Sequence, residues 1–203
     1  MLRTALVLSL LVASLPVLAG NKTLLVLGDS LSAGYGIPVQ QGWVSLLQER
    51  LTRSGNGYTV INASISGETT SGTSARLDAV LESGKPDLVI VELGGNDGLR
   101  GLALEEISAN LSGIITRLKT SGARVLLLPM QLPANYGPAY NDRFMKIYRD
   151  LARQHEITLG RFILEHIADQ PELMQSDGIH PVAGAQRLML DNIWPDVASL
   201  LKP

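Results

Sequence analysis

The sequence predicts an α/β protein in which helices cover both faces of a central parallel sheet of five strands. Short apolar segments of strand length alternate along the chain with longer segments of helical period. This alternation is typical of parallel sheets, because two consecutive parallel strands must be joined by a crossover connection, which is usually a helix. Only 4% of the residues are aromatic and aliphatic residues are plentiful, which suits strands buried on both faces. We therefore expect a three-layer α/β/α sandwich that forms one domain over residues 20–203.

The expected strands are apolar runs that are short enough for strands. They lie at 23–28, 58–63, 87–93, 124–129 and 157–160, of which the last is the weakest. Residues 58–61 alternate poorly between polar and apolar side chains, so we expect the second strand to be buried on both faces.

Five helices are expected at 42–53, 70–83, 103–120, 140–155 and 182–201. The third repeats apolar residues at steps of three and four, which forms one apolar face. Gly84 and Gly122 suit the ends of the second and third helices, and Pro181 suits the start of the last.

Residues 1–19 have the pattern of a secretory signal peptide. Arg3 precedes an apolar run at 5–15, and small residues predict cleavage after Ala19. The alternative is a membrane anchor, but a spanning helix needs about 20 apolar residues, and this run is shorter and followed by Pro16. We expect export to a bacterial periplasm or the medium, without a stable membrane anchor.

The composition excludes several kinds of site. A formal net charge of −2 does not favour a nucleic-acid partner, and the absence of cysteine excludes disulfides, thiolate zinc sites and cysteine nucleophiles. No cluster of ligand residues indicates a metal, and we expect no cofactor. His155 and His166 are expected to be exposed or half-buried helix residues. The simplest expectation is a monomer that acts on a small molecule.

Polar residues or glycine follow three of the expected strands. Ser30 comes after the first, Gly67 after the second and Asn96 after the third. Because ligands bind outside the carboxyl ends of parallel strands, these residues are expected at one edge of the sheet. Asp177 precedes His180 by three residues near the C-terminus. Nucleophile, oxyanion donor, orienter and base are the roles that acyl transfer needs, so the sequence predicts a serine hydrolase.

Two other classes of protein compete with this interpretation. A nucleotide-binding module also places glycine-rich turns after strands, but Gly34 and Gly36 have no third glycine at the expected position, and no phosphate-loop lysine motif follows. A structural or carbohydrate-binding module would leave the serine, asparagine and histidine unexplained. Stabilisation by nucleotides, or ligand binding without turnover, would favour these alternatives.

Four segments resemble the sequence blocks of the GDSL, or SGNH, hydrolase family. They are Gly28-Asp29-Ser30-Leu31, the segment that ends at Gly67, Gly94-Gly95-Asn96-Asp97 and Asp177-Gly178-Ile179-His180-Pro181. The flanking residues resemble the bacterial periplasmic branch of that family, which contains thioesterases, arylesterases and lysophospholipases. The resemblance implies a flavodoxin-like SGNH hydrolase fold.

The resemblance also implies roles for individual residues. Ser30 is the nucleophile, His180 the base and Asp177 the orienter, and the oxyanion hole consists of Ser30, Gly67 and Asn96. The expected reaction is hydrolysis of aryl esters, acyl-CoA thioesters and lysophospholipids through an acyl-enzyme on Ser30. The competing substrate class is carbohydrate O-acetyl esters, which the same residues can hydrolyse.

Each of these residues also has a structural interpretation. Ser30 could be an ordinary helix cap, and Asn96 and Asp177 could be turn residues beside glycines. Asp29 and Asp97 are expected to accept hydrogen bonds that brace loops, without a catalytic role.

Two segments beside the site are expected to contact the acyl group. Gly98, Leu99 and Gly101 form a flexible, partly apolar loop after the asparagine, while Leu132 and Pro133 follow the fourth strand. The alternative for Leu132 and Pro133 is that they only cover the core.

Overall fold

Five parallel strands form the centre of the protein, in the order β2-β1-β3-β4-β5. The structure is a computed structural model that describes residues 22–201, so the expected signal peptide at 1–19 lies outside the described residues. The strands are β1 (Lys22–Gly28), β2 (Tyr58–Asn62), β3 (Leu88–Glu92), β4 (Arg124–Leu127) and β5 (Thr158–Leu159). This strand order is that of doubly wound, flavodoxin-like proteins.

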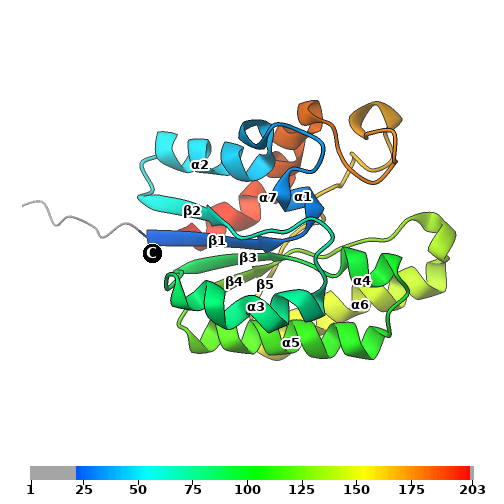
Figure 1. Ribbon diagram of the computed structural model, residues 1–203, viewed down its shortest axis with the longest axis horizontal. Helices are drawn as coiled ribbons and strands as arrows, with labels where there is room; N and C mark the ends of the chain where they lie inside the picture. The colour runs from blue at the N-terminus through cyan, green and yellow to red at the C-terminus, as the bar shows by residue number, and fades with distance from the viewer. Residues whose placement is uncertain (1–21, 202–203) are drawn as a thin grey trace, which may run out of the picture.

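Helices cover both faces of the sheet, which confirms the predicted α/β/α sandwich (Figure 1). One face carries α1 (Ser30–Ala33), α2 (Trp43–Arg53) and α7 (Gln186–Leu201), and α2 packs against α7. The other carries α3 (Thr70–Glu82), α4 (Gly95–Leu99), α5 (Leu104–Thr120) and α6 (Pro138–His155), with α5 against both α3 and α6. Short 3-10 turns lie at Val39–Gln41, Ala134–Tyr136, Pro171–Leu173 and Ala183–Ala185.

The core follows the predicted pattern closely. Every residue of β3 is buried, as a strand covered on both faces requires. The apolar face predicted for the third helix is the buried face of α5. Among residues 22–201, none of the helices is long and apolar enough to cross a membrane.

The second strand is not buried on both faces, contrary to the prediction. β2 lies at the end of the sheet, where it pairs with β1 alone, and the side chain of Ile61 is 42% exposed. The poor alternation at 58–61 therefore reflects an edge strand.

The last helix also begins later than predicted. Pro181 pairs with Met174 in an isolated antiparallel bridge, and Val182 N–H donates to the Leu173 carbonyl. This extended backbone cannot also be helical, so a 3-10 turn intervenes and α7 starts at Gln186. The consequence for function is that His180 sits on a braced loop instead of on the first turn of a helix.

Two short helices and one histidine differ from expectation as well. α1 and α4 directly follow β1 and β3, and four or five residues are too few for a helical period to be recognised. His166 is exposed and lies in a turn with a positive φ of 59°, not in a helix. His155 is half-buried at the end of α6.

Candidate active site

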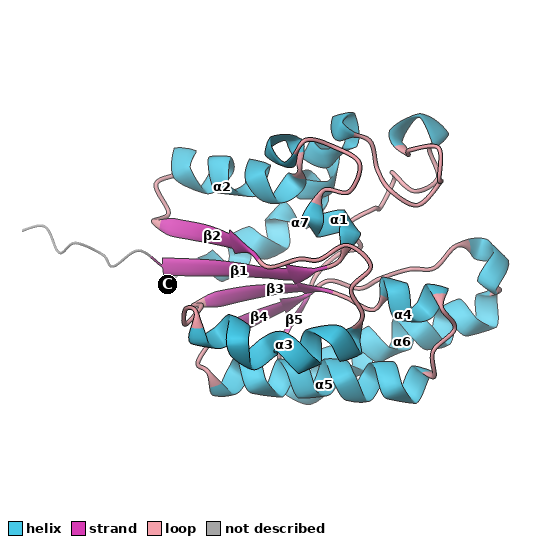
Figure 2. Cartoon of the chain, in the orientation of Figure 1, coloured by secondary structure: helices cyan, strands magenta, loops and turns pink. Residues whose placement is uncertain are grey.

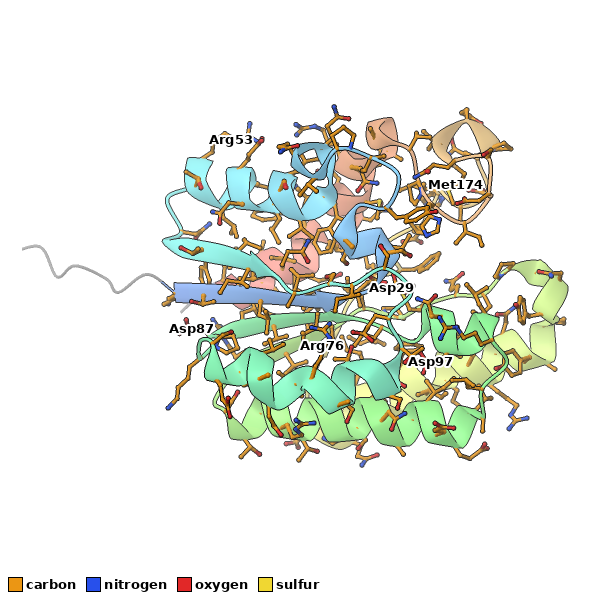
Figure 3. The ribbon with its side chains drawn as sticks, in the orientation of Figure 1. Asp29, Arg53, Arg76, Asp87, Asp97 and Met174 are labelled. Atoms are coloured by element: carbon orange, nitrogen blue, oxygen red, sulfur yellow. The ribbon has the colours of Figure 1, made fainter. Side chains whose placement is uncertain are left out.

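The carboxyl ends of the strands carry most of the polar residues singled out above. The arrowheads of β1 and β3 point to the same side of the molecule, where α1 and α4 begin (Figure 2). Asp29, Asp97 and Met174 all lie on that side (Figure 3). The sheet therefore gathers residues that are far apart in the sequence at one edge.

Ser30 is the first residue of α1, but it does not cap the helix. The cap is Asp29, whose Oδ1 accepts from Leu31 N–H at 3.0 Å. The Ser30 hydroxyl instead lies 2.8 Å from His180 Nε2. This geometry leaves the hydroxyl available for chemistry.

His180 is held from its other side by a carboxylate. Its Nδ1 lies 2.7 Å from Asp177 Oδ2, while Asp177 Oδ1 accepts from the backbone N–H groups of His180 at 3.0 Å and Ile179 at 2.9 Å. These hydrogen bonds, led by the one from His180 N–H, lower the pKa of Asp177 to about 2. Asp177 is therefore ionised at neutral pH, which favours the tautomer with the proton on Nδ1 and leaves Nε2 to accept from Ser30.

Asn96 lies in the first turn of α4, and its side-chain amide donates a hydrogen bond to a buried carboxylate. Its Nδ2 donates one hydrogen to Asp29 Oδ2 at 3.0 Å. A side-chain amide carries two hydrogens, so the second remains available to a ligand.

Gly67 occupies the loop after β2 with a φ of +79°, a conformation that favours glycine. Arg100 Nη2 donates to the Gly67 carbonyl at 3.0 Å, which ties this loop to the end of α4. On the other side of the loop, Arg76 donates to Glu68 and to the Ala63 carbonyl. Gly67 is not one of the described residues that line the cavity beside Ser30.

Two buried acidic residues lie behind Ser30, and one of them has no counterpart in the sequence-based prediction. Glu92 ends β3 with no exposed surface, and its Oε2 accepts from Ser32 Oγ at 2.6 Å and from Asp29 N–H at 3.3 Å. Burial, followed by the nearby charge of Asp29, raises the pKa of Glu92 well above its usual range. Burial also raises the pKa of Asp29 to about 6. The sequence signal that could have pointed to Glu92 is its place as an acidic residue within the apolar run that forms β3.

Asp97 accepts from the backbone N–H and the hydroxyl of Thr70, at 3.0 and 2.6 Å. It thereby fixes the start of α3 against α4. Both Asp29 and Asp97 thus brace neighbouring segments, as expected.

A cavity of about 500 Å³ opens beside Ser30 and His180. Its walls are mostly apolar, and the apolar residues come from four separate segments: Leu31, Leu99, Met130, Leu132, Pro133, Ala134, Phe162, Leu164, Ala168, Met174 and Ile179. Of the five residues predicted to contact an acyl group, Leu99, Leu132 and Pro133 line this cavity. A cavity of this size and lining suits an apolar ligand.

Gly98 and Gly101 do not line the cavity, and the predicted flexible loop is largely helical. Gly98 is buried within α4, where a Cβ atom would come within 2.7 Å of Leu132 Cδ2. Gly98 therefore supports the wall residue Leu132 from behind. Gly101 is exposed in the turn after α4, with a φ of +66°.

A second serine–histidine contact shows why proximity alone does not make a site. Ser112 Oγ lies 2.8 Å from His155 Nε2, between α5 and α6. Burial, with a smaller effect of Lys119, lowers the pKa of His155. Among residues 22–201, no carboxylate contacts the His155 ring as Asp177 contacts that of His180. Across residues 22–201 there is also no group of three or more histidine, cysteine, aspartate or glutamate residues suited to a metal ion.

Comparison with known proteins gives consistent matches over nearly the whole described chain. Residues 26–188 match the GDSL-like lipase/acylhydrolase family. Esterase TesA of Pseudomonas aeruginosa is 49% identical over 183 residues, covering 90% of this chain and 91% of that protein. Thioesterase 1/protease 1/lysophospholipase L1 of Escherichia coli K12 is 43% identical, covering 91% of this chain and 86% of that protein. A crystal structure of TesA matches with a TM-score of 0.86 at 49% identity, over 88% of this chain and 99% of that one.

Proposed function

This chain belongs to the GDSL-like lipase/acylhydrolase family, and on that premise we propose that Ser30, His180 and Asp177 carry its chemistry. The protein is a hydrolase of ester bonds, and its relatives are named as esterases and as a thioesterase and lysophospholipase. The observation that carries the assignment of residues is the chain of contacts at 2.8 and 2.7 Å from Ser30 through His180 to Asp177, beside an apolar cavity.

Acylation begins when Ser30 Oγ attacks the carbonyl carbon of the ester and passes its proton to His180 Nε2. The tetrahedral intermediate carries a negative oxygen, which accepts hydrogen bonds from Ser30 N–H, Gly67 N–H and Asn96 Nδ2. The bond from carbon to the leaving oxygen or sulfur then breaks, and His180 returns the proton to the leaving group.

Deacylation repeats these steps with water. His180 Nε2 takes a proton from water, the hydroxide attacks the acyl carbon, and Ser30 Oγ leaves with the proton that His180 gives back. Asp177 stabilises the imidazolium in both half-reactions and stays ionised, because its pKa is about 2.

The cavity supports apolar acyl chains as substrates. Leu99, Leu132 and Pro133 contact the chain in this proposal, and Gly98 acts only through Leu132. Each buried CH₂ group contributes about 0.8 kcal/mol, so a cavity of this kind favours chains longer than acetyl. The proposed substrates are thus small-molecule acyl esters and thioesters. The proposed enzyme is a monomer that residues 1–19 direct to export.

A panel of substrates tests this function against the alternative. Aryl esters, acyl-CoA thioesters, lysophospholipids and acetylated sugars are compared for wild-type protein and for Ser30→Ala. We expect hydrolysis that increases with chain length and loss of at least about 10³-fold in Ser30→Ala. Strong preference for acetylated sugars would favour the carbohydrate O-acetyl esterase instead.

A further inference from the structure

Tyr35 is a large aromatic side chain that rests on the histidine of the site while half of its surface stays exposed. Its ring centroid lies 4.4 Å from that of His180, with 36° between the two planes. The residue is nevertheless 51% exposed. A tyrosine that only filled the core would be buried, so this one presents an open apolar surface next to the reacting groups.

The position of Tyr35 is fixed by hydrogen bonds from the two segments that carry Ser30 and His180. Tyr35 N–H donates to the Ser30 carbonyl at 3.1 Å, and Gln175 Nε2 donates to the Tyr35 carbonyl at 2.8 Å. Gln175 N–H in turn donates to the His180 carbonyl at 2.7 Å. One glutamine therefore connects Tyr35 with the loop of the histidine, which makes the ring a built part of the site.

The two halves of an ester substrate need two different surfaces. In the described part of the chain, the residues that line the apolar cavity do not include Tyr35. With the acyl chain in that cavity, the leaving oxygen must come within hydrogen-bond reach of His180 Nε2 to receive its proton. The ring of Tyr35 is exposed and lies next to this imidazole, with 4.4 Å between the ring centroids, so it is a surface that the group attached to that oxygen can reach.

We propose that Tyr35 forms a leaving-group subsite that selects aromatic alcohols by stacking against their rings. This proposal rests on the proposed function, because it needs Ser30 and His180 to act as described. In acylation the bond between the carbonyl carbon and the phenolic oxygen breaks, a bond to Ser30 Oγ forms, and His180 gives the serine proton to the departing phenol. Stacking at this subsite acts on acylation alone, because the phenol has left before water attacks.

The test is a series of butanoyl esters that share one acyl group and differ in the alcohol. Phenyl, naphthyl, cyclohexyl and ethyl esters are compared for wild-type protein, Tyr35→Ala and Tyr35→Phe. The ratio of variant to wild-type kcat/KM is taken for each ester, which removes the intrinsic difference between leaving groups. Val39→Ala is the matched control, since Val39 is an exposed apolar residue, 61% accessible, on the neighbouring 3-10 turn.

We expect Tyr35→Ala to lower kcat/KM for the two aryl esters by about three- to tenfold relative to the ethyl and cyclohexyl esters. Tyr35→Phe keeps the aromatic ring and therefore keeps the preference. The deacylation rate, measured from the common butanoyl-enzyme, is unchanged in both variants.

Two results would overturn the proposal. An equal loss on all four esters, with slower deacylation, would mean that Tyr35 only positions His180. No loss on any ester would mean that the ring contacts no leaving group. Failure of the proposed function is separately visible, because Ser30→Ala would then keep its activity on every ester whatever Tyr35→Ala does.

Discussion

Gly98→Ala is expected to shorten the acyl chains that the enzyme accepts, through its contact with Leu132. A Cβ atom at position 98 would lie 2.7 Å from Leu132 Cδ2, 2.8 Å from Leu132 Cδ1 and 3.1 Å from Phe144 Cε2. Phe144 is fully buried, whereas Leu132 lines the cavity, so Leu132 is the side chain that can give way. The open space beside Leu132 is the cavity that we propose for the acyl chain.

The size of the effect follows from the space that is lost. If the displaced Leu132 takes up the space of about one methylene group, an acyl chain that reaches it loses about 0.8 kcal/mol of apolar contact. This loss lowers kcat/KM for such chains by about fourfold. Acetyl esters, whose acyl group ends near Ser30, keep their rate. The folded state loses at most about 2 kcal/mol, because Ala gains about 1 kcal/mol over Gly within a helix while the overlap costs about 1–3 kcal/mol.

The assay is kcat/KM for p-nitrophenyl esters from acetyl to dodecanoyl, with two further variants. Leu132→Ala also costs long chains more than acetyl. In the double variant Gly98→Ala/Leu132→Ala, the alanine at 98 keeps only its contact with Phe144 and adds no further cost to long chains relative to acetyl. Gly113→Ala is the control, because this helical glycine of α5 has nothing within 4 Å of the Cβ position. If Gly98→Ala still reduced long-chain turnover in the Leu132→Ala background, backbone stiffness and not the contact would be the cause.

Four further results are expected. Asn96→Ala should lower kcat by about 10²–10³-fold with little change in KM, because the lost donor acts on the oxyanion; an effect on KM alone would remove Asn96 from the oxyanion hole. Asp177→Asn should lower kcat by about 10⁴-fold, since the histidine loses its tautomer, and near-normal turnover would contradict the assigned orienter. The pKa of Asp29 is raised from 3.8 to about 6 in the folded protein, so its contribution to the free energy of unfolding is largest below pH 4 and is lost as pH rises through 6. The free energy of unfolding measured in urea should therefore fall over this range in wild-type protein and fall less in Asp29→Asn. EDTA should leave ester hydrolysis unchanged, and restoration of a lost activity by a divalent ion would point to a metal site.

The sequence predicted the layers of the fold because strand and helix periods recur along the whole chain. Its errors lie where tertiary contacts decide the outcome. Nothing local marks β2 as an edge strand, and the bridge between Met174 and Pro181 depends on a contact that delays the start of α7. The helix α4 is short and rich in glycine, so its low helix propensity suggested a loop. In the structure it is a helix that packs against Leu132 and Phe144.

The candidate site was predictable to the extent that its residues directly follow strands. Ser30 and Asn96 could be placed at one edge for that reason, and His180 lies beside Ser30 through contacts of its braced loop. Glu92 and Tyr35 were missed, because an acid at the end of a strand and an aromatic after a turn become informative only when their neighbours are known. Gly98 was predicted to contact the acyl group, but in the structure it lies behind Leu132 and does not line the cavity. Sequence alone could not show this, because the contact joins two segments far apart in the chain.

Detection of an acyl-enzyme on Ser30 is the most direct test of the proposed mechanism. Wild-type protein is mixed with an excess of p-nitrophenyl butanoate, quenched in acid during turnover, digested and analysed by mass spectrometry. We expect that the peptide that contains Ser30 carries a butanoyl group, that His180→Ala prevents its formation, and that a serine-directed phosphonate labels the same residue. An unmodified Ser30 peptide during turnover, together with an active Ser30→Ala variant, would show that Ser30 is not the nucleophile.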